Sequence, residues 1–191
     1  MNAFSQLQTK SLYTVGHSTR SIGELVGILQ SSNVSILTDV RSYPKSFTNP
    51  QFNSEAMAKV LPQHSIEYVW MPKLGGRRED LGRKSKNTCW KNKSFRNYAD
   101  YMETQPFREG FTDLANLTQK GTVAIMCAEA LYWRCHRSMI SDYAKSKGFR
   151  VVHLIGEDKQ TEHKYSECAR IVRGVLTYRV DSGILDFVTQ V

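Results

Sequence analysis

The sequence predicts one α/β domain with a mostly parallel central sheet flanked by helices. Short strand-like runs alternate along the chain with segments of helical periodicity, as in a parallel sheet with crossover helices. Residues 34–40 and 122–127 are largely apolar, as strands are when helices cover both faces of a sheet. The chain has 191 residues, 40% of them hydrophobic, which is enough for one ordinary core. We therefore treat residues 1–191 as a single domain.

The expected elements are read from periodicity and from capping signals. We expect strands at residues 12–15, 34–40, 66–71, 122–127 and 149–155. We expect helices at residues 22–30, 95–102, 107–117 and 134–147, and one that is capped by Asn53 or Ser54 and runs through residue 61. Ser21 and Glu24 have the capping-box spacing, and Gly148 is typical of the position after a helix. Residues 160–191 form a C-terminal extension, in which residues 165–175 favour a helix.

Three polar clusters fall at the carboxyl ends of predicted strands. They are Gly16-His17-Ser18, Asp39-Val40-Arg41, and Cys127-Ala128-Glu129, the last leading into Cys135-His136-Arg137. In open α/β sheets the ligand site lies beyond the carboxyl ends of the strands. The sequence therefore predicts that these clusters converge on one site.

Most of the excess positive charge lies in one segment. The net charge is +8, and residues 73–96 contain nine basic and two acidic residues. The basic residues are Lys73, Arg77, Arg78, Arg83, Lys84, Lys86, Lys91, Lys93 and Arg96. Such a patch attracts a polyanion, and nearby aromatics such as Trp90, Tyr132 and Trp133 can stack on unpaired bases. We expect DNA as the partner; the alternatives are a solvated loop for the segment and core packing for the aromatics.

Two carboxylates are the candidate groups for acid–base chemistry. Glu129 lies beyond a buried strand, where apolar surroundings raise the pKa of a carboxyl group, and Asp39, at the end of another strand, would supply a second carboxylate with which to position water. The alternatives are structural. Asp39 would form an ion pair with Arg41 or cap a loop, and Glu129 would form a salt bridge to Arg134 or Arg137.

The remaining candidates carry a functional and a structural interpretation each. His17 is a general base or a phosphate donor, or else makes a hydrogen bond to a loop carbonyl. Arg137 and the helix N-terminus beside it can hold a phosphate. Cys127 is a nucleophile, or else a small buried residue that closes a strand. Cys127, Cys135 and His136 are metal-ligand types, but no C-x-x-C pair is present and we expect no metal.

Several classes of protein do not fit the sequence. It contains no P-loop, dinucleotide-binding glycine motif, Ser-His-Asp signature or H-E-x-x-H helix, so we expect no cofactor. No apolar run approaches the roughly 18 residues that span a membrane, and the first ten residues lack an apolar signal core. Four cysteines are too few for a disulfide scaffold and suggest a reducing, cytoplasmic setting. No obligate protein partner is indicated.

Five segments together resemble one family. They are YTVGHSTRSIGEL, TDVRSYPKSFTNPQFN, YVWMPKLGGRR, FRNYADYM and MCAEALYWRCHRSMI, and they resemble domain-of-unknown-function family 488 over residues 12–156. The resemblance implies an α/β fold and a shared site formed by the matched polar residues, but it implies no reaction. A weaker similarity, in ILTDVRS and in residues 126–157, is to rhodanese-like domains. It implies a persulfide on Cys127 and a loop arginine at Arg134 or Arg137.

Three functions follow from these observations. The favoured one is a DNA-directed hydrolase that removes a base by N-glycosidic cleavage, using Glu129 and Asp39 and no metal. A bulky or modified base is a sensible target, because normal bases must be refused, and the chemistry would suit DNA repair or phage defence. The alternatives are a rhodanese-like sulfur or phosphate transferase using Cys127, and a nucleic-acid-binding module without enzymatic activity.

Overall fold

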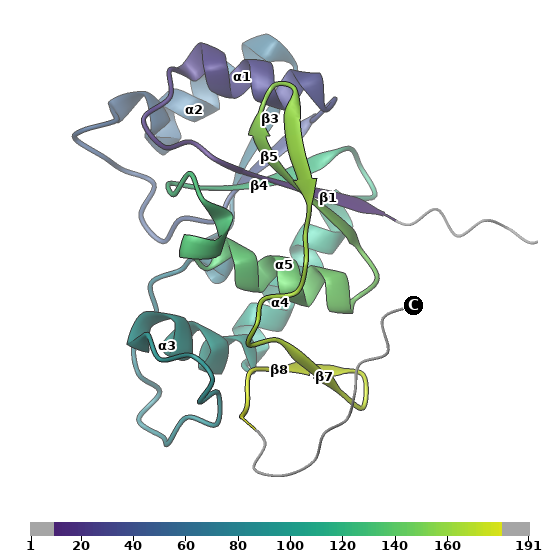
Figure 1. Ribbon diagram of the computed structural model, residues 1–191. Helices are drawn as coiled ribbons and strands as arrows, with labels where there is room; N and C mark the ends of the chain where they lie inside the picture. The colour runs from purple at the N-terminus through teal and green to yellow at the C-terminus, as the bar shows by residue number, and fades with distance from the viewer. Residues whose placement is uncertain (1–9, 181–191) are drawn as a thin grey trace, which may run out of the picture.

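The computed structural model describes residues 10–180 and contains a six-stranded sheet (Figure 1). The strands are β1 (Ser11–Gly16), β2 (Ile36–Asp39), β3 (Glu67–Trp70), β4 (Val123–Cys127), β5 (Arg150–Gly156) and β6 (Lys159–Glu162). Their order in the sheet is β3-β2-β4-β1-β5-β6, and only β6 runs antiparallel to its neighbour. The predicted mostly parallel α/β sheet is therefore confirmed, with β6 as an edge strand that the sequence reading missed.

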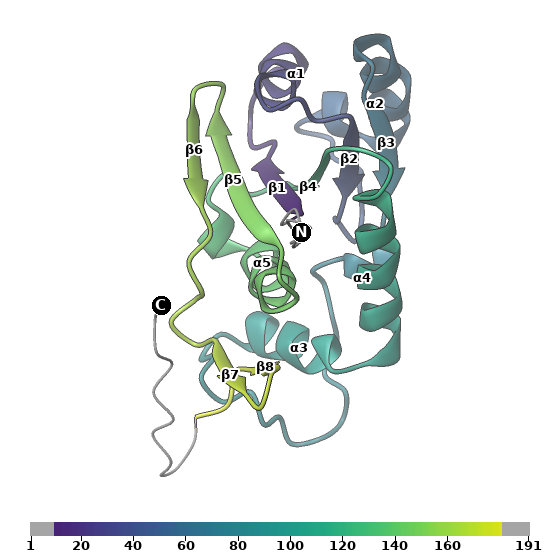
Figure 2. The same ribbon diagram turned by 90° about the vertical axis from the view of Figure 1, so that its right-hand side faces the viewer.

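Helices cover both faces of this sheet (Figure 2). They are α1 (Ile22–Ser31), α2 (Ser54–Val60), α3 (Lys93–Met102), α4 (Gln105–Leu117) and α5 (Arg137–Ser146). Strand β4 is buried throughout and divides its side chains between two cores. Val123 and Ile125 pack with α3, α4 and α5, whereas Ala124 and Met126 pack with α1 and α2. This two-sided burial explains the apolar run in the sequence.

The helix-capping signals predicted from neighbouring residues are confirmed. Ser21 and Glu24 form the full capping box of α1, and Gly148 follows α5 with a φ of +86°. The helix expected from residue 134 instead begins at Arg137. Residues Tyr132–Arg134 form a 3-10 turn and Cys135 is extended, which leaves the chain free to bend into the site.

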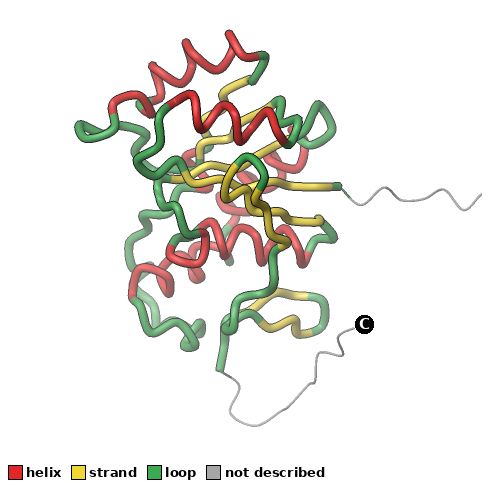
Figure 3. The backbone as a smooth tube through the Cα atoms, turned by 45° about the horizontal axis from the view of Figure 1, so that its top comes forward, coloured by secondary structure: helices red, strands yellow, loops and turns green. Residues whose placement is uncertain are grey.

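The helix expected at residues 165–175 is wrong. The structure has a small hairpin there, formed by β7 (Arg170–Val172) and β8 (Val175–Thr177), which lies apart from the main sheet (Figure 3). Arg173 and Gly174 both have positive φ, at 51° and 76°. A two-residue turn of this kind matches the twist of a hairpin and cannot continue a helix.

A disulfide ties this extension to the basic segment. Cys89 is bonded to Cys168, whereas Cys127 and Cys135 are free and buried. Two of the four cysteines therefore do not fit the reducing setting that the cysteine count suggested. Within residues 10–180, no helix is both long and apolar enough to cross a membrane.

Candidate functional site

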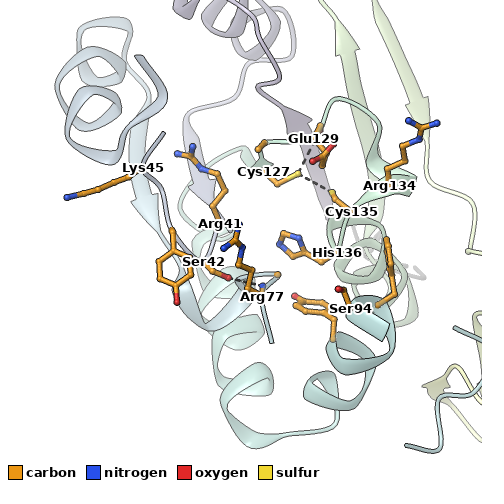
Figure 4. A pocket seen from close by; sticks show the side chains of 15 residues that line it. Arg41, Ser42, Lys45, Arg77, Ser94, Cys127, Glu129, Arg134, Cys135 and His136 are labelled. Atoms are coloured by element: carbon orange, nitrogen blue, oxygen red, sulfur yellow. Dashed lines mark hydrogen bonds between the residues drawn. The ribbon is translucent and has the colours of Figure 1, made fainter. Parts of the chain in front are cut away.

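A pocket of about 600 Å³ lies at the carboxyl ends of β2 (Ile36–Asp39) and β4 (Val123–Cys127) (Figure 4). Its lining residues are Arg41, Ser42, Tyr43, Lys45, Gly76, Arg77, Ser94, Phe95, Tyr98, Cys127, Ala128, Glu129, Arg134, Cys135 and His136. The volume suits a small-molecule or nucleotide ligand. Members of two of the three predicted clusters line the pocket, namely those that follow β2 and β4, whereas Gly16-His17-Ser18 does not.

The lining is cationic with one exception. It contains the basic side chains of Arg41, Lys45, Arg77 and Arg134, and Glu129 is its one acidic residue. Glu129 is exposed, and its carboxylate has no hydrogen bond or ion pair with any residue in the described range 10–180. The alternative predicted for Glu129, a salt bridge to Arg134 or Arg137, is therefore not formed. The arrangement favours an anionic ligand held beside a single open carboxylate.

Close backbone packing fixes the loop that carries Glu129. The His17 N–H donates to the Cys127 carbonyl over 3.0 Å, and the Ser18 N–H donates to the Ala128 carbonyl over 2.9 Å. A Cβ on Gly16 would collide with the Glu129 carbonyl, so glycine is required there. The end of β1 thus holds the Glu129 loop against the sheet.

Arg137 also holds this loop and does not face the pocket. It is 2% exposed, and its Nη2 donates to the Glu129 carbonyl over 2.8 Å and to the Ala130 carbonyl over 3.3 Å. The phosphate-binding role expected for Arg137 is therefore not supported. Its charge is used inside the protein to position the Glu129 backbone.

Asp39 forms a buried ion pair with Arg41, which is its predicted structural role. It is fully buried, and its oxygens accept hydrogen bonds from Arg41 Nε over 2.9 and 3.0 Å and from Tyr68 Oη over 2.7 Å. Burial opposes the charge on Arg41, but hydrogen bonds to Asp39 outweigh it and raise the pKa of Arg41. Asp39 does not line the pocket, so its expected role as a second carboxylate acting on water is not supported. It orients Arg41, which does line it.

His17 stands behind Arg41 and is a second positioning residue. Its Nδ1–H donates to the Ser18 carbonyl over 2.8 Å, which leaves Nε2 to accept a hydrogen bond from Arg41 Nη1 over 3.1 Å. The ring stacks on Phe52 at a centroid distance of 4.2 Å. Burial lowers the pKa of His17 to about 4. The Nε2 lone pair already accepts a hydrogen bond from Arg41, so His17 has no free lone pair with which to act as a general base. The structural role predicted as its alternative fits the geometry better.

His136 is neutral and retains an open ring nitrogen. Its Nε2–H donates to the Val40 carbonyl over 2.9 Å, and Nδ1 has no hydrogen-bond partner within residues 10–180. Gly76 packs against this ring so closely that a Cβ would strike Nδ1, and Tyr98 meets it edge-on at 5.1 Å. Burial lowers the pKa of His136 to about 4. The ring therefore presents a hydrogen-bond acceptor at the wall of the pocket.

Two thiols meet at the inner wall of the pocket. The Sγ atoms of Cys127 and Cys135 are 3.1 Å apart, and both residues line the cavity (Figure 4). The hydrogen bond to Cys135, together with burial, raises the pKa of Cys127. The same hydrogen bond lowers the pKa of Cys135 to about 7, against the effect of burial and with help from the charge of Arg137. Cys127 is the candidate nucleophile in the sequence, whereas Cys135 is the more acidic thiol in the structure.

Some basic side chains of residues 73–96 are paired within the protein, and others have no ion-pair partner in the described range. Lys73 pairs with Glu109 over 2.9 Å and Arg83 with Glu103 over 3.1 Å. Arg78 lies over the Tyr101 ring at 3.8 Å. The exposed Lys84, Lys86, Lys91 and Lys93 and the half-buried Arg96 have no ion pair in the described range, and Arg77 alone among the nine reaches the pocket. The segment's role in nucleic-acid binding stays a prediction.

The aromatics chosen from the sequence are mostly packed. Trp90 stacks on Phe95 at 4.9 Å, and Tyr132 stacks on His153 at 3.4 Å. Trp133 is 54% exposed. The structure adds two residues that sequence reasoning missed, since Tyr43 and Phe47 are exposed on the loop after β2. Their signal was two aromatics in a proline- and asparagine-rich loop directly after a polar strand end.

Fold and site together define an α/β protein with a cationic pocket beyond the carboxyl ends of its parallel strands. Residues 21–144 match the family model described as "Domain of unknown function DUF488". The chain therefore belongs to this family, whose description names no reaction. Neither the curated proteins nor the solved structures contain a significant match to it.

Proposed function

We propose that the protein is a DNA-directed hydrolase that cleaves an N-glycosidic bond and releases a base. The observation that carries this proposal is the unpaired carboxylate of Glu129 in a pocket with four cationic side chains. Base release by hydrolysis needs a carboxylate, a water molecule and stabilisation of a sugar cation, and it needs no metal or cofactor. The pocket offers the carboxylate, and its cationic side chains are suited to hold a phosphate.

Glu129 is the group that would act on the water. Its carboxylate accepts a proton as the water oxygen bonds to the anomeric carbon, and its negative charge stabilises the cation-like sugar in the transition state. The bond from sugar to base breaks, and the base departs with the bonding electron pair beside the guanidinium of Arg41 or Arg77. It then takes up the proton that Glu129 received, which restores the carboxylate.

The surroundings of the pocket fit a DNA strand with an extruded base. Arg77 and Lys45 lie at the pocket and can contact phosphates, although Lys45 also faces Glu55 at 4.0 Å. Phe47, on the same loop as Lys45, is fully exposed. An exposed phenylalanine beside a basic surface is suited to insert between base pairs and hold open the gap left by the extruded base.

The test is base release from a panel of DNAs with plain and modified bases. Abasic sites are detected by alkaline cleavage after incubation with the wild type or with Glu129→Gln. We expect sites on at least one DNA, and a loss of about 10²–10⁴-fold in Glu129→Gln because the general base is removed. Salt-sensitive binding without abasic sites on any DNA would contradict the proposal and favour the binding-module alternative.

The transferase alternative is weaker in this geometry. A persulfide-forming nucleophile has to be a thiolate, and the Cys127 thiol is held protonated by burial and by its hydrogen bond to Cys135. Loss of activity in Cys127→Ser, with Glu129→Gln unaffected, would revive that alternative.

A further inference from the structure

The two free cysteines of this chain lie in contact. Cys127 is the last residue of β4, and Cys135 comes just before α5, so the sheet and the helix bring them together across seven intervening residues. Their Sγ atoms are 3.1 Å apart, and an approach of about 1 Å would bring them to bonding distance. Cys89 and Cys168 are already bonded to each other, so this pair is the chain's whole supply of free thiols.

The pair is asymmetric in the way that an exchanging dithiol requires. Cys135 lies at the N-terminus of the ten-residue helix α5, where backbone N–H groups and the Arg137 charge favour a thiolate. Cys127 shares a hydrogen bond with this sulfur, in which either thiol can donate, and it is the more deeply buried residue, at 2% exposure against 8% for Cys135. Cys135 is thus placed to attack, and Cys127 is placed to attack Cys135 in turn.

We propose that Cys135 and Cys127 form a reactive dithiol that undergoes exchange with small anionic disulfides entering the pocket. In the first step the Cys135 thiolate bonds to one sulfur of the disulfide, and the other sulfur leaves as a thiolate that takes up a proton. In the second step Cys127 loses its proton and bonds to the Cys135 sulfur, which releases the second thiol. The protein pair is oxidised to a disulfide, and the small disulfide is reduced to two thiols.

The charge of the pocket selects the class of disulfide. Arg77 and Arg134 line the same cavity as the thiols, and their side chains have no ion pair within residues 10–180. A disulfide with carboxylates, such as oxidised glutathione, is attracted to these cations, whereas a cationic disulfide such as cystamine is repelled. This reaction is independent of base release, because it uses neither Glu129 nor DNA.

The test measures the mass of the intact protein after incubation with oxidised glutathione or with cystamine. We expect the wild type to lose two hydrogens and to yield a peptide cross-link between Cys127 and Cys135, faster with glutathione. Cys127→Ser should stop at a mixed disulfide on Cys135, and Cys135→Ser should react at least about tenfold more slowly at pH 7. The rate of modification of the wild type should rise with pH through about 7, following the pKa of Cys135, which its hydrogen bond with Cys127 lowers.

Two results would overturn the proposal. One is wild-type protein that stays reduced at both cysteines in excess oxidised glutathione. The other is equal or faster reaction of Cys135→Ser, which would make Cys127 the attacking thiol. Because the wild type alone decides the first point, a variant that fails to fold does not block the test. The mass measurement does not depend on base release, so the dithiol proposal and the glycosidic-cleavage proposal can be contradicted independently of each other.

Discussion

Two polar regions of this molecule use the same residue types in opposite ways. In the first, Thr14 Oγ1 donates to His153 Nδ1 over 2.7 Å, and His153 Nε2 donates to His163 Nδ1 over 2.9 Å. His163 Nε2 in turn donates to Asp142 over 2.9 Å. All four residues are at most 1% exposed. Every donor in this buried chain has an acceptor, so its function is to hold the fold together.

The pocket contains similar groups that are left open. Nδ1 of His136 and the carboxylate of Glu129 have no hydrogen-bond partners among the described residues, and Cys135 faces a cavity. The comparison shows that the presence of histidines and carboxylates does not by itself identify a functional site. What marks it is an unoccupied lone pair or charge beside a space that a ligand can enter.

The largest expected effect breaks the buried network. Asp142 also accepts hydrogen bonds from the Ser166 N–H and hydroxyl and from Tyr178 Oη. Asp142→Asn replaces one acceptor oxygen with a donor, and we expect the free energy of unfolding to fall by about 3–5 kcal/mol, because buried partners are left unpaired. Urea unfolding measures this loss. The activity of the folded fraction should be unchanged; a specific loss of activity would mean that the network is part of the site.

The next effect is the loss of stability at low pH, to which histidines of both the buried network and the pocket region contribute. Burial lowers the pKa of His17 and His136 to about 4 and that of His153 to about 2. Below pH 6.5 the unfolded chain binds protons at these histidines that the folded protein does not bind. The free energy of unfolding should therefore fall as the pH drops from 6.5 toward 4, by at most about 2 kcal/mol per histidine at pH 5.

Urea unfolding at a series of pH values measures this slope. His153→Gln should reduce the slope through the buried network and His136→Gln through the pocket, so the two variants separate the regions. A free energy of unfolding that stays constant between pH 7 and pH 5 would contradict the neutral histidines described above.

A smaller effect tests whether Phe47 belongs to the proposed DNA interface. Phe47→Ala should lower base release by about tenfold, because the inserted side chain that favours an extruded base is lost. Val175 on β8 is a matched control, since it is also apolar and exposed but lies on the separate hairpin. The expected result is an intact rate in Val175→Ala. Equal rates for both variants would remove Phe47 from the proposed interface.

The smallest effect, on DNA binding, tests whether lysines of the basic segment contribute more than lysines elsewhere on the surface. Lys84→Gln with Lys86→Gln should weaken DNA binding and lower the slope of log affinity against log salt by about 2. Lys59→Gln, an exposed lysine on α2, should change neither quantity. The measurement is a salt titration of binding to a duplex. A slope that responds equally to all three substitutions would indicate nonspecific attraction by the net charge.

Local signals made the fold predictable, and long-range contacts decided the rest. The capping box of Ser21 and the apolar strand β4 are properties of short segments, and both could be predicted. The disulfide between Cys89 and Cys168 spans 79 residues, and no local pattern announces it. The hairpin turn at Arg173 and Gly174 left a short-range signal, but one weaker than the helical pattern around it.

The site shows the same division. The convergence of the strand ends followed from topology alone. Which carboxylate faces the pocket did not, because Tyr68, on the neighbouring strand, helps to hold Asp39 inside, whereas nothing in the described structure covers Glu129. The contact between Cys127 and Cys135 depends on where α5 begins, which the sequence placed three residues too early.

The most direct test of the central claim separates binding from chemistry at Glu129. On a DNA from which the wild type releases a base, Glu129→Gln is compared with Glu79→Gln, which removes an equal charge from the exposed basic segment. We expect Glu129→Gln to bind this DNA as tightly as the wild type while producing about 10²–10⁴-fold fewer abasic sites, and Glu79→Gln to retain both properties. Abasic sites formed at the wild-type rate by Glu129→Gln would contradict the assignment of the open carboxylate as the reacting group.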